Sequence, residues 1–335
     1  MRAKVVHIAG SKGKGTVAWL ISEGLRASGF KVGLFSSPFI LSEEEMIRIN
    51  GVSIPRKRLD DYLEKVQIGK ELSEFEALTE AAFLCFEEEE CDYIILECGW
   101  GGKMDATNRI EKKDLTILTH IELEHMEVLG DTLKKITLEK LGICRPGVPL
   151  LTASSQDAAV MQTIEDAGFK VEIAPSAELN YHNPESTGLA LFALEKLGVV
   201  LDSKILDALA KLIIPGRFEV LKMDEHVLIL DGAHTYDSIR SLEGRVLTYA
   251  QEHGLPLPLW AIHTLKDKPK DLWTLFPIGR TVWLELDHPR ASTPPDQLPK
   301  TTVEQLLSEL KLEETPKLVV FTGSFRVVAE VRKGF

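Results

Sequence analysis

The sequence predicts an α/β protein of two domains, each a mostly parallel sheet covered by helices. Two observations predict this class. Short apolar runs alternate with helical patterns along the chain, and the alternation breaks and restarts once, at Pro215-Gly216. The length of 335 residues suits two domains of ordinary size. We therefore expect an N-terminal domain over residues 1–214 and a smaller, Rossmann-like α/β domain over residues 215–335.

The apolar runs define the expected strands, and residues at helical spacing define the helices between them. We expect Asp131 to cap its helix. The strands expected in the N-terminal domain are Val5–Ala9, Val32–Phe35, Tyr93–Leu96, Leu115–Thr119, Val148–Leu151 and Val171–Ile173. Its helices are Thr16–Ala27, Phe75–Glu88, Asp131–Ile143, Ala158–Ala167, Ser186–Leu197 and Ser203–Leu212. The C-terminal domain is expected to hold strands Val227–Leu230, Leu259–Ile262, Val282–Leu286 and Leu318–Phe321, with helices Ser238–Ala250, Val303–Leu310 and Phe325–Val331.

The composition of the chain excludes some classes of function. A net charge of −12 argues against general nucleic-acid binding, which needs a basic face. The four cysteines show no CxxC spacing, which favours reduced core thiols over a zinc site or a disulfide framework. We find no apolar run long enough to span a membrane and no signal peptide, so we expect a cytoplasmic protein that binds no membrane.

Polar residues gather where predicted strands end. In open parallel sheets, ligands bind beyond the carboxyl ends of the strands. Core packing does not readily explain why several strands of this sequence are each followed by polar residues. The residues in question are Gly10 to Thr16, Ser36, Ser37, Glu97, His120, His125, Asp231, His234 and His263.

The segment from Gly10 to Thr16 reads Gly-Ser-Lys-Gly-Lys-Gly-Thr and lies between a strand and a helix. Gly10, Gly13 and Gly15 allow backbone N–H groups to turn toward an anion, and the helix N-terminus adds partial positive charge. Lys14 can reach terminal phosphates, and Thr16 can offer its hydroxyl to Mg²⁺. A glycine-rich turn with two exposed lysines is the alternative, but the flanking strand and helix favour a nucleotide-binding loop and a P-loop ATPase domain.

Several motifs in order along the chain resemble the Mur ligase superfamily and, within it, folylpolyglutamate synthase and dihydrofolate synthase. His7–Thr16 resembles HVAGTNGKGS, and Leu96–Asn108 resembles LEVGLGGRLDATN. Leu123–Gly147 resembles LDHTEILGDTLEEIAREKAGIIKPG. Pro215–Phe218 with Leu230–His234 resembles LPGRFE followed by LDGAHNP, and Phe321–Arg332 resembles VTGSLYLVAEVR.

The resemblance assigns roles to single residues. It implies two Mg²⁺ sites, one of which uses a carbamylated Lys140, and the implied metal ligands are Ser37, Glu97, His125 and Lys140. The implied ATP contacts are Gly10, Gly13, Lys14, Gly15, Thr16, Asn108, Arg217, Asp231 and His234, of which Lys14, Arg217 and His234, with Lys140, serve catalysis. The substrate residues are Phe39, Phe75, Glu76 and Lys268. The residues alone leave alternatives open: His125 as a helix-flanking histidine, although Glu97 and the loop favour a metal ligand, and Asp231 with His234 as a helix cap. Read alone, Lys140 is a solvated lysine near a helix C-terminus.

The activity implied is ATP-dependent amide-bond formation, in which a carboxylate is activated as an acyl phosphate and attacked by an amine. The resemblance implies a folate-type carboxylate, L-glutamate as the amine and a monomeric enzyme. Lys12 stands in place of the usual asparagine, and Glu124 replaces the aspartate of the LDH motif. The chain has nine residues before the loop and a short stretch between Leu151 and Pro215, which predicts a reduced folate pocket. A Mur-type ligase with another acceptor, a nucleotide-binding protein without ligase activity and a generic P-loop NTPase are the alternatives.

Overall fold

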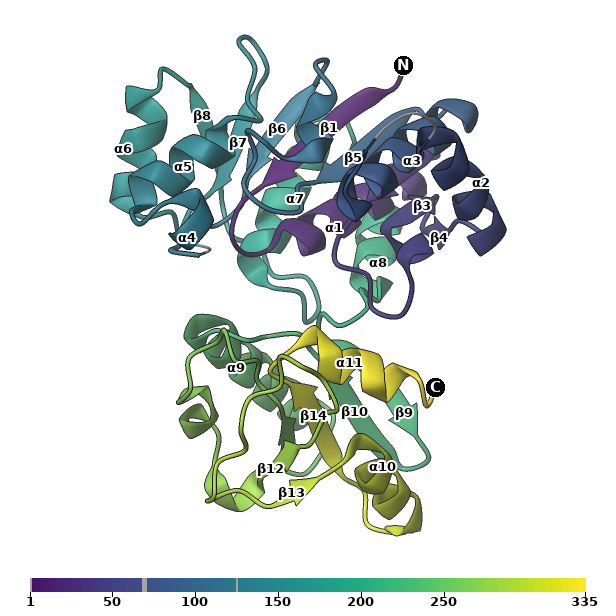
Figure 1. Ribbon diagram of the computed structural model, residues 1–335, viewed down its shortest axis with the longest axis vertical. Coiled ribbons are helices and arrows are strands. Elements are labelled where there is room, and N and C mark those ends of the chain that lie inside the picture. The colour runs from purple at the N-terminus through teal and green to yellow at the C-terminus, as the bar shows by residue number, and fades with distance from the viewer. Residues whose placement is uncertain (1, 68–70, 125) are drawn as a thin grey trace. The chain divides into compact units, whose positions relative to one another are not determined.

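The computed structural model describes residues 2–67, 71–124 and 126–335, and the chain divides into two compact units, Met1–Leu212 and Ile213–Phe335 (Figure 1). Each unit is an α/β layered structure, as the alternating pattern predicts. The predicted assignment of residues 1–214 and 215–335 to a Mur-type central domain and a Mur-type C-terminal domain stays a prediction.

The first unit contains an eight-stranded sheet in the order β4-β3-β2-β5-β1-β6-β7-β8. The six strands from β2 to β8 in this order are parallel, whereas β3 and β4 form an antiparallel edge. The strands are β1 (Lys4–Ala9), β2 (Val32–Phe35), β3 (Ile47–Ile49), β4 (Val52–Ser53), β5 (Tyr93–Glu97), β6 (Leu115–Leu118), β7 (Leu150–Ala153) and β8 (Val171–Ala174). Parallel strands place their carboxyl ends at one edge, so the residues after β1, β2, β5 and β6 lie together there.

Helices cover both faces of this sheet. On one face the core joins β1, β2, β5, β6 and β7 to α1 (Lys14–Ala27), α7 (Pro184–Lys196) and α8 (Ser203–Lys211). On the other face two cores lie under α2 (Arg56–Gln67) and α3 (Glu74–Glu88), and under α5 (Leu133–Leu141) and α6 (Ala158–Asp166). The short α4 (Met126–Leu129) precedes α5, and 3₁₀ turns cover Glu43–Met46 and Ala106–Arg109. A sheet covered on both faces explains why its strands are continuous apolar runs.

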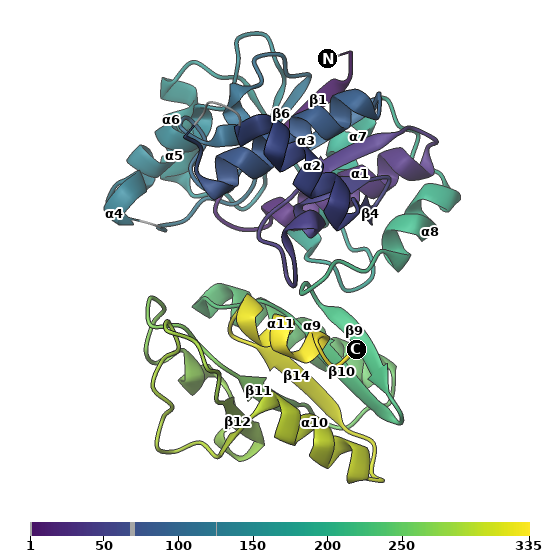
Figure 2. The same ribbon diagram turned by 45° about the vertical axis from the view of Figure 1, so that its right-hand side comes forward.

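The second unit contains a six-stranded sheet in the order β13-β12-β11-β14-β10-β9, parallel except for β9. Its strands are β9 (Glu219–Met223), β10 (His226–Leu230), β11 (Leu259–Ile262), β12 (Thr281–Leu284), β13 (Lys300–Thr301) and β14 (Leu318–Thr322). Its helices are α9 (Tyr236–Glu252), α10 (Val303–Leu312) and α11 (Phe325–Arg332), with 3₁₀ turns at Leu272–Leu275 and Ile278–Arg280 (Figure 2).

The cap expected for one helix is wrong. The helix expected from Asp131 begins at Leu133, and its cap is Thr132, whose hydroxyl accepts a hydrogen bond from the Lys135 amide. Asp131 instead pairs with the Lys135 ammonium at 2.9 Å. Both side chains suit a helix N-terminus, and threonine occupies the one residue whose extended backbone directs its oxygen at the first turn.

Candidate functional site

The phosphate loop follows β1 and ends at the first turn of α1. Gly10 has φ of 147° and Gly13, the residue before α1, has φ of 86°, in the range that favours glycine. A Cβ on Gly10 would lie 1.9 Å from the Thr119 hydroxyl oxygen, and one on Gly13 would lie 2.6 Å from that of Ser186. Glycine is therefore required at both positions for conformation and for space.

Backbone hydrogen bonds fasten the loop to the segment after β6. The amides of Ser11 and Lys12 donate to the carbonyl of His120 at 2.8 and 3.2 Å. The Ser11 hydroxyl donates to the Glu122 carbonyl and accepts from the Glu122 amide, both at 3.2 Å. The segment after β6 therefore holds the phosphate loop on one side.

Two lysine ammonium groups meet at one carbonyl oxygen of this loop. Lys14 Nζ and Lys140 Nζ each donate to the carbonyl of Gly10 at 2.9 Å. Lys140 comes from the last turn of α5, 126 residues beyond Lys14, and its side chain is fully buried. The interpretation of Lys140 as a solvated lysine is therefore wrong, because the fold brings it from α5 into the base of the loop.

Glu124 is the acidic partner of Lys140. Its Oε1 accepts from Lys140 Nζ at 2.7 Å. Burial lowers the pKa of Lys140, against the opposing effect of Glu124, and Lys14 lowers it further. For Glu124, burial favours the neutral acid, but the charges of Lys140 and Lys14 outweigh it and lower the pKa. The site therefore holds an ionised carboxylate next to a lysine that loses its proton more readily than usual.

Glu97 ends β5 beside the loop and is 3% exposed. Its Oε2 accepts from the Ser37 amide at 3.0 Å, and both carboxylate oxygens lie 3.4 Å from the point where a Cβ on Gly15 would stand. Thr16, one residue further, is also buried. A carboxylate, a serine and a threonine at one sheet edge form an oxygen-rich set of the kind that Mg²⁺ prefers.

His125, the remaining predicted metal ligand, lies outside the described residues. Within the ranges that are described, three or more His, Cys, Asp and Glu side chains do not gather into a metal-binding group. Of these residue types, the predicted ligand set contains only Glu97 and His125. The donors at hand fit a magnesium ion through oxygen atoms.

Asn108 was expected to bind the nucleotide, yet its side chain has partners within the chain. Its amide group donates to the carbonyls of Lys103 and Gly142 at 3.0 and 3.1 Å. Its oxygen accepts from Lys113 and Arg145 at 2.5 and 3.1 Å. These bonds join the loop after β5 to the end of α5, so Asn108 has a structural function that the sequence did not reveal.

The predicted substrate residues of the first unit lie near β2 and α3. The Phe75 ring packs against Phe35 at a centroid distance of 5.6 Å, and a Cβ on Gly99 would lie 2.6 Å from it. Phe39 is partly buried against the same core. Glu76 completes a capping box, since its Oε2 accepts from the Ser73 amide at 2.9 Å. Glu76 therefore caps its helix, and its contact with substrate stays a prediction.

In the second unit, the predicted nucleotide residues surround the carboxyl end of β10. Asp231 accepts from the amides of Phe218 and Ala233, both at 2.9 Å. The Arg217 guanidinium lies 4.5 Å from the centroid of the Phe325 ring, and His234 Nδ1 contacts the Gly232 carbonyl at 2.7 Å. Asp231 therefore orders the segment after Pro215.

Lys268 lies in the same unit, beyond β11. Its Nζ is 3.4 Å from an oxygen of Asp267, which also pairs with Arg290 at 2.9 Å. The Lys268 side chain is 24% exposed, so a ligand can reach it.

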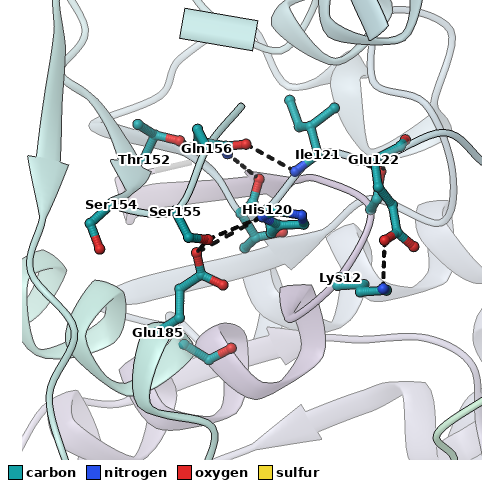
Figure 3. Close-up of polar contacts among 12 residues, drawn as sticks. Lys12, His120, Ile121, Glu122, Thr152, Ser154, Ser155, Gln156 and Glu185 are labelled. Carbon is teal, nitrogen blue, oxygen red and sulfur yellow. Dashed lines mark hydrogen bonds and ion pairs between the residues drawn. The ribbon is translucent and has the colours of Figure 1, made fainter. Parts of the chain in front are cut away.

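A polar cluster next to the phosphate loop was only partly foreseen. His120 Nδ1 lies 3.2 Å from the Ser155 hydroxyl, and that hydroxyl donates to Glu185 in the first turn of α7. Gln156 donates to the Thr119 carbonyl at 2.8 Å. Figure 3 shows these side chains together with Lys12 and Glu122. The sequence indicated His120 by its place after a strand, but gave no signal for partners 35 and 65 residues away.

Known proteins resemble the chain over most of its length. It is 29% identical to dihydrofolate synthase/folylpolyglutamate synthase of Bacillus subtilis, over 99% of this chain and 90% of that protein. It is 31% identical to a folylpolyglutamate synthase of Arabidopsis thaliana, over 72% of this chain and 50% of that protein. No family model matches the chain.

Solved structures show the same architecture. Escherichia coli FolC in complex with DHPP and ADP superposes with a TM-score of 0.84 at 26% identity, over 99% of this chain and 88% of that one. The Yersinia pestis bifunctional enzyme complexed with AMPPNP and Mn superposes with a TM-score of 0.86 at 25% identity, over 100% and 89%. Fold, loop and relatives together define an ATP-dependent ligase. The chain belongs to the folylpolyglutamate synthase/dihydrofolate synthase-like family of Mur ligases.

Proposed function

We propose that this ligase adds L-glutamate to a folate-type carboxylate, with ATP activating the carboxylate as an acyl phosphate. The observation that carries the proposal is the convergence of Lys14 and Lys140 on the Gly10 carbonyl, beside Glu97. Phosphoryl transfer needs positioning and charge neutralisation more than it needs a protein nucleophile. The names of the relatives and the ADP and AMPPNP complexes support the same chemistry.

In this proposal the loop amides and Lys14 hold the phosphates of ATP. Lys14 donates to the Gly10 carbonyl at the base of the loop, from where its ammonium can reach phosphate oxygens. We expect Lys14→Ala to lower ATP turnover on the order of a thousandfold, because a charged contact to the transferred group is lost. Unchanged ATP turnover in Lys14→Ala would show that this loop does not bind the nucleotide.

Divalent metal belongs to the proposal through Ser37, Glu97 and His125, with Lys140 as a carbamate for a second ion. Magnesium would neutralise charge on the phosphates. The lowered pKa of Lys140 supports the carbamate, because only the neutral amine reacts with CO₂. The carbamate would face Glu124, so a cation has to balance the two negative groups. We expect short carboxylates such as formate to restore part of the activity lost in Lys140→Ala, whereas Lys14→Ala is not rescued.

Arg217, Asp231, His234 and Lys268 are proposed to serve the nucleotide and the incoming glutamate. Asp231 makes two amide hydrogen bonds that order the Arg217 segment, which supports a positioning role for this carboxylate. Lys268 is an accessible cation of the kind that a glutamate carboxylate recognises.

The proposed acceptor is a folate-type carboxylate. The stretch between Leu151 and Pro215 is short, so we expect folates to bind more weakly than in longer relatives. Losing about 100 Å² of buried apolar area weakens binding by about 2.5 kcal/mol, nearly two decades. Calorimetry with dihydropteroate, tetrahydrofolate and a polyglutamylated folate measures this. Turnover on another carboxylate, with no folate binding, would identify a Mur-type ligase with a different acceptor.

The proposal extends to location, partners and oligomeric state. None of the helices in the described residues combines the length and the apolar character that crossing a bilayer demands. A monomeric, cytoplasmic enzyme without nucleic-acid partners remains part of the proposal.

A further inference from the structure

The phosphate loop carries an ion pair that the proposed reaction does not use. Lys12 Nζ lies 2.5 Å from Glu122 Oε2, with side chains that are 27% and 25% exposed. Lys12 directly precedes Gly13, and Glu122 lies in the segment after β6 that faces the loop (Figure 3). Both charges are therefore at the loop and within reach of a ligand from solvent.

The pair is not what holds the loop in place. The Ser11 and Lys12 amides and the Ser11 hydroxyl already join the loop to His120 and Glu122 through backbone groups. Partly exposed ion pairs contribute little to stability, because solvent screens them and long side chains lose freedom. We therefore expect these two charges to affect how strongly the loop binds a ligand.

An anion on the loop interacts with both charges. Glu122 repels it, and Lys12 both neutralises Glu122 and attracts the anion. Lys14 and Lys140 donate to the Gly10 carbonyl, whereas the ammonium of Lys12 is paired with a partly exposed carboxylate. The flexible four-carbon stem of Lys12 lets this ammonium turn from Glu122 to a phosphate.

We propose that Lys12 is a phosphate-positioning residue and that Glu122 holds it back, so that the pair sets the affinity of the loop for the nucleotide. Glu122 lowers this affinity and Lys12 raises it. The inference rests on the proposed function, which places the phosphates of the nucleotide on the loop.

Calorimetric titration of ADP into Lys12→Gln, Glu122→Gln and the double variant tests the proposal. At low ionic strength we expect Glu122→Gln to tighten ADP binding about fivefold and Lys12→Gln to weaken it about fivefold, with the double variant between them. Lys12→Arg keeps the charge and should stay within about twofold of the wild type. The differences should shrink in about 0.5 M salt, because salt screens charges near the surface.

The exposed pair of Lys211 and Asp207 on α8, with a contact of 2.9 Å, provides a matched control. Lys211→Gln and Asp207→Asn change the net charge equally and should leave ADP affinity unchanged. Equal weakening by Lys12→Gln and Glu122→Gln, or effects no larger than the control, would show a purely structural clamp and overturn the inference. If Lys14→Ala leaves ADP binding intact, the proposed function fails instead.

Discussion

Replacing Lys140 by methionine should destabilise the metal-free chain, because the side chain is fully buried and bonded to two groups. Methionine fills most of the space but leaves the Gly10 carbonyl and the Glu124 carboxylate without their donor. An unsatisfied buried group costs about 1–3 kcal/mol, and breaking a fully buried pair costs about 3–5 kcal/mol. Glu124 is 22% exposed, so water recovers part of this cost, and we expect a loss of about 2–3 kcal/mol.

Urea unfolding at neutral pH measures the loss. Glu124→Gln should destabilise the wild type but stabilise the Lys140→Met background, because it removes a carboxylate that has lost its partner. The lowered pKa of Glu124 adds a pH signature. Its stabilisation is present above the ordinary carboxyl pKa and is lost as the pH falls through the folded-state value, and Lys140→Met should reduce this acid-side loss. A loss under about 0.5 kcal/mol, or equal effects of Glu124→Gln in both backgrounds, would refute the reasoning.

Two further predictions concern the loop and the residues behind it. Gly10→Ala should lower the unfolding free energy by more than about 2 kcal/mol and abolish ADP binding, because its Cβ would collide with Thr119. Gly244→Ala in α9, where a Cβ meets nothing within 4 Å, should instead raise the unfolding free energy by about 0.5–1 kcal/mol. Burial and the nearby Arg145 lower the pKa of Lys113 to about 8. Between about pH 8 and 10, Lys113 therefore holds its proton in the unfolded chain but not in the folded chain. The unfolding free energy of the wild type should rise relative to that of Lys113→Met by up to about 1.4 kcal/mol per pH unit. A difference in urea unfolding that does not change with pH would contradict this.

The sequence predicted the part of the site that single strands determine. Glu97 ends one strand and the phosphate loop follows its neighbour, so a parallel sheet places them at one edge. Only the family resemblance predicted Lys140 as a site residue. Its position depends on how α5 packs, which the local sequence pattern does not encode.

The missed features depend on contacts between distant segments. The pairing of Lys12 with Glu122, 110 residues later, and the four bonds of Asn108 are set by loop packing that no periodicity reports. The antiparallel edge of β3 and β4 was also missed, since these strands have only three and two residues. Short edge strands carry too few residues for an alternating pattern to emerge.

The central claim is that ATP activates the acceptor carboxylate as an acyl phosphate before glutamate attacks. Its most direct test uses a folate-type acceptor labelled with ¹⁸O in the reacting carboxylate, together with ATP, Mg²⁺ and L-glutamate. An acyl phosphate requires that one labelled oxygen leaves with the phosphate, so the account predicts one ¹⁸O in each inorganic phosphate released with amide product. Unlabelled phosphate accompanying amide formation would contradict it.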